Sequence, residues 1–324
     1  MPQAIQIHKT GGPEVMLLEE VTVGEPGPGE ARIRHTAVGL NYIDVYFRMG
    51  LYPSPPFPFS PGMEGAGEVL ALGEGVADLA VGDRVAYAGP LGAYAEERII
   101  AADRLVRTPD SVSDVTAASM MLQGMTVQYL LKSSYPVRAG DTILFHAAAG
   151  GVGLIACQWA KHLGATVIGT VGSDEKAELA RAHGCDHPIV YTRENVVERV
   201  RELTDGQGVP AVYDSVGRDT FNDSLDCLRP AGTMVNFGQS SGPIPPFEIG
   251  VLGQKGSLYL QRPTLMSYTA RREDLVAMAE DLFEVVTSGA VRIRTNQTFA
   301  LADAPDAHRA LEGRRTTGST VLVP

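Results

Sequence analysis

A glycine-rich turn in the middle of the chain constrains its fold more than any other feature. The turn, residues 147–153, follows a short apolar run at residues 142–146 and precedes a helical apolar pattern at residues 154–163. A strand, a tight turn and a helix in this order are typical of the first half of a nucleotide-binding βαβ unit. The helix would begin directly after the turn, where its dipole favours an anion.

The turn matches the dinucleotide fingerprint G-x-G-x-x-G at two of its three glycines. The fingerprint needs its first glycine for a tight turn, its second for close approach of backbone N–H groups to a pyrophosphate, and its third for helix–strand packing. Ala148 stands at the first position, and Gly150 and Gly153 stand at the second and third. We expect Gly150, Gly151, Val152 and Gly153 to bind a pyrophosphate; a purely structural glycine turn is the alternative.

Strand and helix patterns alternate from this turn onward. After the first strand, apolar runs predict strands at residues 165–171, 188–191, 211–213 and 233–237, and periodic segments between them predict helices at residues 174–183 and 194–204. Right-handed crossovers between such elements give a parallel sheet that is buried on both faces. The pattern therefore predicts an α/β fold with a Rossmann-type doubly wound parallel sheet.

The flanking regions have a different texture. Residues 1–122 contain short strand-like runs, for example at 31–37, 68–72 and 84–88, separated by glycine and proline clusters. The last region contains a predicted helix at residues 272–288 and ends in a strand-like run. Because the parallel sheet is already complete by then, we predict a discontinuous arrangement. Residues 1–124 form the first part of a β-rich domain, residues 125–262 form the nucleotide-binding domain, and residues 263–324 return to the first domain.

Composition and charge exclude several classes of protein. Of the 324 residues, 44% are hydrophobic and 20% are charged, which is typical of globular proteins. The 27 basic and 38 acidic side chains give a net charge of −11, which repels nucleic-acid phosphates and anionic lipid headgroups. The three cysteines are too few and too separated for a disulfide framework, and no signal-peptide pattern begins the chain. We expect a cytoplasmic protein without nucleic-acid partners or membrane insertion.

The residues after the second predicted strand favour NADPH over NADH. NAD enzymes place a carboxylate at the tip of this strand, where it binds the ribose 2′-hydroxyl and repels a 2′-phosphate. Here the strand ends without a carboxylate, and Ser173 and Lys176 follow. Lys176 could reach a phosphate, although it could also be an ordinary solvated lysine. Asp174 and Glu175 suit the first turn of a helix, where the dipole favours acidic residues.

The sequence does not favour a zinc site. A catalytic zinc needs three protein ligands and a structural zinc needs four. The β-rich region before residue 123 has two histidines and no cysteine. The one local cluster, His183, Cys185, Asp186 and His187, lies in a segment that indicates a polar loop after a helix stop. We therefore expect no metal.

Without a metal or a Ser-His-Asp arrangement, the substrate must accept hydride readily. Quinones and alkenes conjugated to a carbonyl have this property, whereas simple ketones do not. The segment at residues 39–52 concentrates tyrosines, an asparagine and aromatic faces, which suit a flat ring with oxygen substituents. Half-buried packing is the alternative role for these tyrosines.

Several segments in one order resemble a known family. They are HKTGGPEV (residues 8–15), GLNYID (39–44), RMGLYP (48–53), LGAY (91–94), FHAAAGGVGLIACQWA (145–160), VYDSVGRD (212–219) and QKGSL (254–258). In these segments the chain resembles the zinc-independent quinone oxidoreductases of the medium-chain dehydrogenase/reductase superfamily, which include bacterial NADPH:quinone reductases related to ζ-crystallin. The resemblance implies a GroES-like catalytic domain, a Rossmann domain, and a cleft between them for NADPH and a small-molecule quinone.

The resemblance also implies roles for individual residues. Asn41 matches an asparagine near the nicotinamide, and Tyr46 and Tyr52 match aromatic residues of the substrate cleft. The other positions match residues around the cofactor, namely Thr126, the turn Gly150 to Gly153, Ser173, Lys176, Tyr191, Ser215, Gly217, Phe237, Gly238 and Ser241. Arg262 matches a family arginine without an assigned role. Gln123 departs from the lysine expected in close relatives, which leaves the substrate range open.

The expected function is NADPH-dependent quinone reduction. An enone or enoyl reductase that uses the same site is one alternative, and a structural module that binds NADPH without turnover is another. We also expect a homodimer, because an exposed edge strand near residues 233–237 and 254–260 would pair with a second copy across a two-fold axis.

Overall fold

The computed structural model describes residues 1–324 and divides into two compact units. Unit 1 contains Met1–Met125, Thr269–Phe283 and Ile293–Pro324, and unit 2 contains Thr126–Tyr268 and Glu284–Arg292. Both ends of the chain therefore belong to unit 1. The sequence predicts independent domains with limits after residues 124 and 262, and these domain limits remain predictions.

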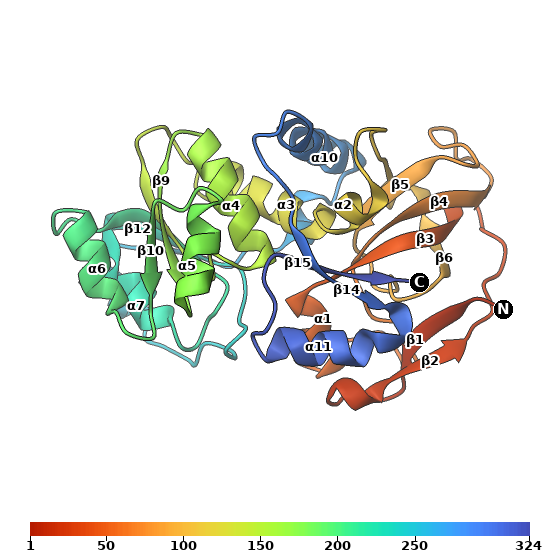
Figure 1. Cartoon of the computed structure of the whole chain (residues 1–324), viewed down its shortest axis with the longest axis horizontal. Coiled ribbons are helices and arrows are strands. Elements are labelled where there is room, and N and C mark those ends of the chain that lie inside the picture. The colour runs from red at the N-terminus through yellow and green to blue at the C-terminus, as the bar shows by residue number, and fades with distance from the viewer. The chain divides into compact units, whose positions relative to one another are not determined.

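Unit 2 is built on a six-stranded parallel sheet, at the left of Figure 1. Its strands are β8 (Thr142–Phe145), β9 (Thr166–Val171), β10 (His187–Val190), β11 (Val209–Asp214), β12 (Leu228–Asn236) and β13 (Tyr259–Gln261). They lie in the order β10-β9-β8-β11-β12-β13, and every neighbouring pair is parallel. Counted from β8, this is the 3-2-1-4-5-6 order of a dinucleotide-binding fold. The predicted α/β doubly wound sheet is confirmed.

Helices connect these strands, and their ends follow local sequence signals. The elements of unit 2 other than strands are the π-helix Leu130–Ser134, α4 (Gly151–His162), α5 (Asp174–Arg181), α6 (Val196–Leu203), α7 (Phe221–Asp226), α8 (Gly250–Gln254) and α9 (Leu265–Tyr268). The side chains of Ser173 and Asn195 accept hydrogen bonds from the first turns of α5 and α6. Gly184 follows α5 at φ +93°, a conformation that suits glycine after a helix.

The apolar strands of unit 2 share one hydrophobic cluster. Leu144, Ile168, Ile189, Val212 and Met234 each come from a different strand, and each is at most 1% exposed. Burial of an aliphatic side chain of this size contributes about 1.5–3 kcal/mol. The continuous apolar runs of the sequence therefore form strands that are covered on both faces.

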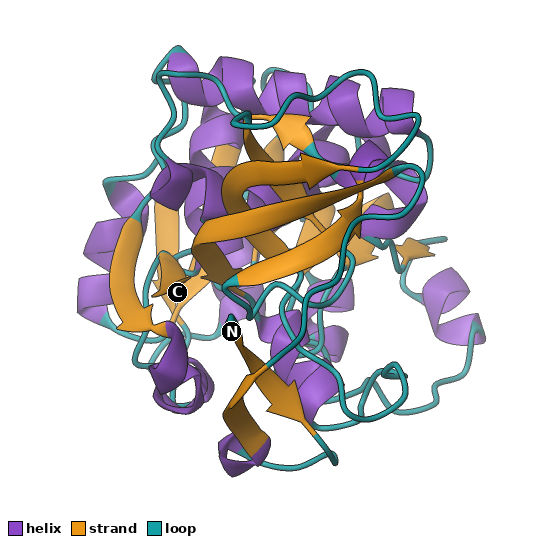
Figure 2. Cartoon of the chain, turned by 90° about the vertical axis from the view of Figure 1, so that its right-hand side faces the viewer, coloured by secondary structure: helices purple, strands orange, loops and turns teal.

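Unit 1 has a mainly antiparallel sheet. Its strands are β3 (Glu30–Leu40), β4 (Glu64–Leu72), β5 (Arg84–Ala88), β6 (Glu97–Ala101), β7 (Val106–Arg107), β14 (Thr295–Ala300) and β15 (Ser319–Val323). They run in the order β14-β15-β3-β4-β5-β7, and β6 also pairs with β3. A separate hairpin joins β1 (Gln3–Ile7) and β2 (Met16–Glu20). Figure 2 shows the long, curved strands of this unit facing the viewer.

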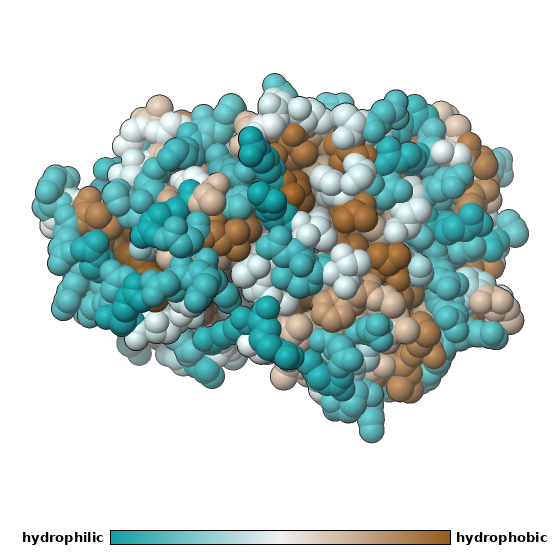
Figure 3. Space-filling model, viewed as in Figure 1, coloured by the Kyte–Doolittle hydropathy of each residue, from teal (hydrophilic) through white to brown (hydrophobic).

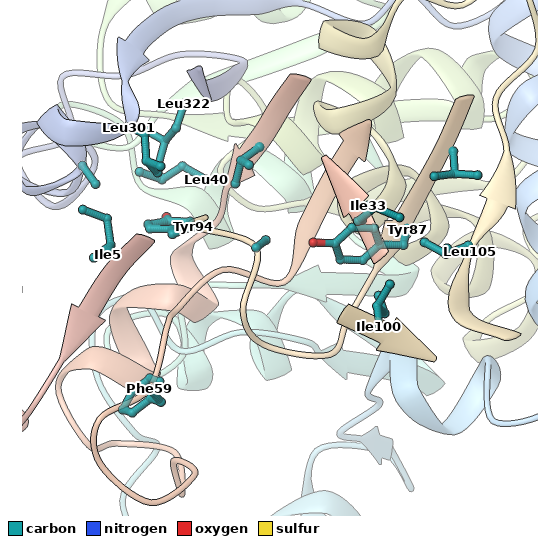
Figure 4. Packing of buried hydrophobic residues seen from close by; sticks show 14 of the residues in the cluster. Ile5, Ile33, Leu40, Phe59, Tyr87, Tyr94, Ile100, Leu105, Leu301 and Leu322 are labelled. Carbon is teal, nitrogen blue, oxygen red and sulfur yellow. The ribbon is translucent and has the colours of Figure 1, made fainter. Parts of the chain in front are cut away.

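β15 brings the C-terminus onto a strand from the N-terminal part of the chain. Thr320 pairs with Leu40 and Leu322 pairs with Val38, in antiparallel register. Side chains from both ends of the sequence also share the core of unit 1, and Figure 4 shows Ile5, Leu40, Leu301 and Leu322 within one cluster. The last segment of the chain is thus part of the same unit as the first.

The helices of unit 1 are short, apart from those that cross the unit boundary. They are α1 (Tyr42–Arg48), α2 (Asp114–Ala118) and α11 (Ala304–Glu312), while α3 (Met121–Tyr129) and α10 (Arg272–Thr287) each contribute residues to both units. No helix is long and apolar enough to cross a membrane.

On the face shown in Figure 3, hydrophobic residues reach the surface in scattered patches among polar ones.

The structure corrects one expectation about the parallel sheet. Residues 233–237 do not form an exposed edge, because β12 lies between β11 and β13. Gln254 ends the helix α8 and is not part of a strand. The edge strand is β13, which overlaps the expected segment 254–260 at its last two residues, and its Tyr259 is 64% exposed.

Candidate functional site

The glycine-rich turn lies at the carboxyl end of β8, at the point where the strand order of the sheet reverses. β8 has β9 on one side and β11 on the other. Ligands of open α/β sheets bind outside the carboxyl ends of the strands at such a point. The 12-residue helix α4 begins at Gly151, and its N-cap residue Gly150 has no side chain to satisfy the first N–H groups. These N–H groups can therefore bind an anion.

Close backbone packing explains the glycine at position 153. A Cβ at Gly153 would lie 2.3 Å from the carbonyl oxygen of Ala147 and 2.7 Å from the backbone of Ala148. At Gly150 the nearest atom, the same carbonyl oxygen, would be 3.3 Å from a Cβ. Ala147 itself takes φ +54°. The turn is thus a tight cradle made of backbone, which fits the pyrophosphate of a dinucleotide.

The loop after β11 is fixed by a buried carboxylate. Asp214 Oδ1 accepts hydrogen bonds from the N–H groups of Val216 and Gly217, at 2.7 and 3.0 Å. Its Oδ2 accepts from the hydroxyls of Thr220 and Ser224, both at 2.8 Å. Asp214 is fully buried, and four donors hold it in place. Ser215 and Gly217 therefore have defined positions beside the carboxyl end of the sheet.

The loop after β12 packs against the loop after β11. Ser241 Oγ donates to the carbonyl of Val216 at 2.8 Å and accepts from the N–H of Asp219 at 3.0 Å. A Cβ at Gly238 would lie 2.5 Å from the carbonyl oxygen of Ser215, so the two backbones touch. Phe237 N donates to the carbonyl of Asp214 at 2.8 Å. The structure thus brings Ser215, Gly217, Phe237, Gly238 and Ser241 together.

Sequence analysis assigned no role to Arg262, and the structure shows one of its contacts. One of its guanidinium nitrogens donates to the carbonyl of Asn236 at 2.9 Å, at the end of β12. Asn236 in turn donates from its side chain to the carbonyls of Asp214 and Gly238. Arg262 therefore supports the ends of these strands.

The end of β9 carries the residues expected around a 2′-phosphate. Ser173 caps α5, because its Oγ accepts from the N–H of Lys176 at 3.3 Å. Tyr191 follows β10 and is 44% exposed. Its hydroxyl lies above Gly172, where a Cβ would be 2.9 Å from that oxygen. Ser173, Lys176 and Tyr191 are thus placed at the carboxyl ends of neighbouring strands.

Arg193 is a residue near this position that sequence analysis missed. Its guanidinium donates to both carboxylate oxygens of Asp174, at 2.7 and 2.5 Å. This contact lowers the pKa of Asp174 and raises the pKa of Arg193. The negative charge of Asp174, which would repel a phosphate at this position, is therefore paired with a cation. The two residues are 19 positions apart, which hides the pair in the sequence.

Asn41 stands at the start of α1 in unit 1. Its backbone N–H donates to Asp44 Oδ2 at 2.9 Å, which is one half of a capping box. Sequence analysis found no helix here, although Asn41 followed three residues later by Asp44 is a capping signature. Thr126, the remaining expected cofactor contact, is half-buried on α3 of unit 2.

Tyr46 and Tyr52 form an aromatic pair. Their ring centroids are 5.1 Å apart, and Tyr52 also meets Phe47 edge-on at 5.7 Å. The N–H groups of Leu51 and Tyr52 both donate to the carbonyl of Tyr46, at 2.8 and 3.2 Å, which turns the chain back onto α1. Tyr46 is 7% exposed and Tyr52 is half-buried, so of the two rings that of Tyr52 is the more accessible.

Arg48 anchors α1 to the last helix of the chain. Arg48 is 1% exposed and makes two 2.9 Å hydrogen bonds to the carboxylate of Glu312. It also donates to Nδ1 of His308, so the proton of that ring is on Nε2, which donates to the Tyr94 hydroxyl. Tyr94 donates in turn to Asp44. Burial, followed by the charge of Arg48, lowers the pKa of His308 to about 3.

A second buried carboxyl group lies beneath Asn41. Asn41 Nδ2 donates to Glu64 Oε2 at 2.6 Å, and Gln123 Nε2 donates to Asn41 Oδ1 at 3.0 Å. The N–H of Leu122, in the first turn of α3, donates to Glu64 Oε1 at 2.9 Å. A Cβ at Gly39 would lie 2.4 Å from Glu64, so glycine is needed on the facing strand. Sequence analysis did not find Glu64.

Burial governs the protonation of both carboxyl groups. It raises the pKa of Glu64 from 4.5 to about 8 and that of Asp44 from 3.8 to about 7, against the opposing effect of their hydrogen bonds. Asp44 also raises the pKa of Glu64 through its charge. Below pH 7 both groups are therefore mainly neutral, which is unusual for carboxyl groups in a protein.

The residues of the loop between α5 and β10 are engaged in other contacts. His183 Nδ1 donates to the carbonyl of Leu179 at 2.7 Å, and Asp186 pairs with Lys161 at 2.7 Å. Cys157, Cys185 and Cys227 are free and buried. The structure contains no group of three or more His, Cys, Asp or Glu side chains that could hold a metal ion.

Comparison with protein families assigns both units. Residues 27–110 match the alcohol dehydrogenase GroES-like domain, and residues 151–283 match the family described as zinc-binding dehydrogenase. The side chains of this chain do not fit the zinc of that description. The predicted GroES-like domain is confirmed by the first match.

Individual proteins and solved structures match this chain over its full length. A Pseudomonas aeruginosa protein named quinone oxidoreductase is 56% identical over all of both chains. A 2-haloacrylate reductase from a Burkholderia species is 46% identical and is matched over 99% of its length by all of this chain. The solved structure of Escherichia coli quinone oxidoreductase complexed with NADPH is 47% identical, with a TM-score of 0.98 over 99% of this chain and all of that one. The chain therefore belongs to the quinone oxidoreductases of the medium-chain dehydrogenase/reductase superfamily.

Proposed function

We propose that this protein reduces small quinones with NADPH. The observation that carries the proposal is the backbone cradle at Gly150–Gly153, which opens at the switch point of a 3-2-1-4-5-6 parallel sheet. The names of full-length relatives, and the NADPH in the Escherichia coli structure, support the same function.

The cofactor residues proposed here belong to unit 2. The N–H groups of Gly151, Val152 and Gly153 would bind the pyrophosphate, because α4 begins there without a side-chain cap. Lys176, Ser173 and Tyr191 would hold the 2′-phosphate. The loops with Ser215, Gly217, Phe237, Gly238 and Ser241, together with Thr126, would contact the rest of the cofactor. NADPH supplies the hydride when it is bound.

The acceptor residues proposed here belong to unit 1. Tyr46 and Tyr52 present aromatic rings to a flat quinone, and Asn41 donates a hydrogen bond to one of its oxygens. A quinone takes one hydride and then one proton to give the hydroquinone. Water can supply that proton, so the reaction requires no side chain as the proton source.

A second candidate reaction is reduction of an alkene conjugated to a carbonyl or carboxyl group. The name of the Burkholderia relative, 2-haloacrylate reductase, favours it. The two reactions would use the same residues and differ in whether oxygen or carbon accepts the hydride.

The test is a steady-state comparison of acceptors with NADPH and with NADH. We expect kcat/KM to be highest for a small benzoquinone or naphthoquinone with NADPH, and lower for 2-chloroacrylate and for a cyclic enone. Asn41→Ala should lower the rate on quinones while NADPH binding, followed by its fluorescence, is kept. Faster turnover of 2-chloroacrylate would favour the second candidate, and NADPH binding without turnover of any acceptor would contradict both.

We further propose a cytoplasmic homodimer. The outer edge of β13 has no neighbouring strand, and its exposed Tyr259 would lie at the pairing edge. The three buried free cysteines are compatible with a reducing compartment. Sedimentation equilibrium of the protein and of Leu260→Pro, which removes an N–H in the middle of β13, tests the dimer. A wild-type protein that sediments as a monomer would contradict it.

A further inference from the structure

The side chain of Asn41 belongs to a chain of four buried polar groups. Ser319 Oγ donates to Gln123 Oε1 at 2.8 Å, Gln123 Nε2 donates to Asn41 Oδ1 at 3.0 Å, and Asn41 Nδ2 donates to Glu64 Oε2 at 2.6 Å. The four residues are between 0% and 7% exposed. They come from β15, α3, the N-cap of α1 and β4, all within unit 1.

This chain of hydrogen bonds suits a Glu64 carboxylate, because every donor points toward it. A neutral Glu64 carries an O–H and needs an acceptor instead. The two amides meet that need if each turns by 180°, since an amide has its oxygen and its nitrogen at nearly equivalent places. Glu64 then donates to Asn41 Oδ1, Asn41 Nδ2 donates to Gln123 Oε1, and Gln123 Nε2 donates to Ser319 Oγ.

Ser319 keeps the Gln123 end of this chain hydrogen-bonded in both directions. Its hydroxyl lies 3.0 Å from the carbonyl oxygen of Ser119 as well as 2.8 Å from Gln123 Oε1. When Gln123 presents its oxygen, the Ser319 hydroxyl donates to it. When Gln123 presents its nitrogen, the hydroxyl accepts from it and donates to Ser119. Either direction therefore keeps the four side chains of the chain paired with one another. Turning Asn41 gives up the bond from the Asp44 N–H to its side chain in the capping box, but that N–H keeps its 3.0 Å bond to the Asn41 carbonyl.

We propose that Glu64 is a positioning residue whose proton sets the direction of the Asn41 amide, and that Gln123 and Ser319 complete this reversible relay. The inference rests on the proposed function, in which Asn41 donates to a quinone oxygen. Glu64 keeps its proton during the reaction. It acts through Asn41 and has no direct contact with substrate.

The neutral direction favours quinone reduction for two reasons. An O–H that donates to Asn41 Oδ1 polarises the amide, and hydrogen bonds in series strengthen one another. The amide nitrogen Nδ2 carries two N–H groups, and one of them donates to Gln123. The other then becomes a better donor to the quinone oxygen on which negative charge develops. In the opposite direction Nδ2 donates to a carboxylate, whose charge opposes the charge that forms on the acceptor.

Among the buried groups around Glu64, two carboxyl groups have pKa values between pH 6 and 9. Glu64 has a pKa of about 8 and Asp44 has a pKa of about 7, both raised mainly by burial. The buried histidines and tyrosines nearby do not change charge between pH 6 and 9, because burial lowers the pKa of the histidines and raises that of the tyrosines. They are His35, His308, Tyr87 and Tyr94. Two arginines contact this group, Arg48 at His308 and Arg98 at the Tyr87 hydroxyl.

The decisive experiment is the pH profile of kcat/KM for a small quinone, in wild type and in Glu64→Gln. Glutamine can donate to Asn41 Oδ1 and accept from Leu122, so it copies the neutral acid. We expect the wild-type value to fall about tenfold for each pH unit above the pKa of Glu64, near pH 8, and the Glu64→Gln value to stay level there. Asp44→Asn is the matched control. It should keep the fall and move it to lower pH, because it removes a nearby negative charge.

Ser319→Ala gives a second, milder variant. It removes the hydroxyl that satisfies Gln123 in both directions, so we expect about a fivefold loss of kcat/KM at pH 7 with little change in the KM for NADPH. A purely structural role would lower the melting temperature and leave kcat/KM unchanged. A Glu64→Gln enzyme that retains the wild-type fall near pH 8 would overturn the proposal.

A readout on the ligand-free protein separates this inference from the proposed function. Infrared difference spectra between pH 6 and pH 9 should show loss of the C=O band of a protonated carboxyl group. Glu64→Gln should remove one such component, and Asp44→Asn should leave it in place. If wild type reduces no quinone, the proposed function fails while the spectra still decide whether Glu64 carries the proton. A spectrum unchanged by Glu64→Gln would refute the relay even in an active enzyme.

Discussion

The two units build their candidate sites from different materials. In unit 2, the phosphate cradle consists of backbone from one continuous turn, where a Cβ at Gly153 would come within 2.3 Å of a carbonyl oxygen. In unit 1, the site consists of side chains from four separate elements, which meet in the order Ser319, Gln123, Asn41 and Glu64. A backbone site depends on the absence of side chains, and a side-chain site depends on their exact partners. Substitutions should therefore affect the two sites in different ways.

The largest effect is expected in the backbone cradle. Gly153→Val would force Cβ and two methyl groups against the backbone of Ala147 and Ala148. We expect a loss of about 4 kcal/mol or more in the free energy of unfolding, together with loss of NADPH binding. Denaturant unfolding and fluorescence titration measure these two quantities. Gly150→Ala is the control, because its Cβ would meet the nearest atom at 3.3 Å and should cost far less stability. Equal stability of the two variants would contradict the view that Gly153 is required by packing.

In unit 1, a substitution is expected to stabilise the protein at alkaline pH. The pKa of Glu64 is about 8 in the folded state and 4.5 when exposed, so the folded state keeps a proton that the unfolded state releases. Its contribution to stability is complete below pH 4.5 and is lost as the pH rises to about 8. Glu64→Gln does not titrate. At pH 9 we expect it to be about 3–5 kcal/mol more stable than wild type, relative to their difference at pH 4, where the upper figure corresponds to the full difference between the two pKa values.

Urea unfolding at the two pH values measures this difference. Asp44→Asn should behave in the same direction over a lower window, from pH 3.8 to about 7. A Glu64→Gln variant that loses stability in parallel with wild type between pH 5 and 8 would show that Glu64 ionises normally in the folded protein.

The contrast between the units also explains what could be predicted from the sequence. Parallel strands buried on both faces are continuous apolar runs, so β8, β9 and β11 were predicted from local pattern alone. The glycine turn was equally local. Glu64 gave no such signal, because its partners Asn41 and Leu122 are 23 and 58 residues away, and only the tertiary fold brings them together. The pair of Asp174 and Arg193 was missed for the same reason.

Two misjudged elements have local causes. The helix α1 is seven residues long and lies between glycines, so its periodicity is too short to separate it from the surrounding β-rich segment. Residues 233–237 were expected at an edge, but the short strand β13, whose three residues are all partly or fully exposed, covers β12 instead. The second expected segment, residues 254–260, overlaps this edge strand at Tyr259 and Leu260, but a strand of three residues carries too little pattern to give its bounds.

A smaller effect is expected for the cation at the proposed 2′-phosphate position. Lys176→Ala should weaken NADPH binding about tenfold and leave NADH binding nearly unchanged, because one charge-assisted hydrogen bond to the extra phosphate is lost. The ratio of the two dissociation constants measures this effect, and added salt should reduce it. Lys161→Ala is a suitable control, because Lys161 lies in the last turn of α4, at the end away from the glycine turn, and pairs there with Asp186. An equal loss of NADPH and NADH affinity would contradict a contact with the 2′-phosphate.

The smallest effect is expected for Arg193, and it distinguishes two roles for this residue. Arg193 pairs with both oxygens of Asp174 at the start of α5, on an exposed surface where a single ion pair adds little stability. Arg193→Ala frees the carboxylate to repel a phosphate, so we expect NADPH binding to weaken about threefold. If Arg193 only neutralises Asp174, the double variant with Asp174→Asn should bind NADPH as tightly as wild type. If Arg193 contacts the phosphate directly, Asp174→Asn alone should strengthen binding and the double variant should remain weak. The first outcome means that the coenzyme preference of unit 2 depends on masking an acidic residue, which a local sequence pattern does not reveal.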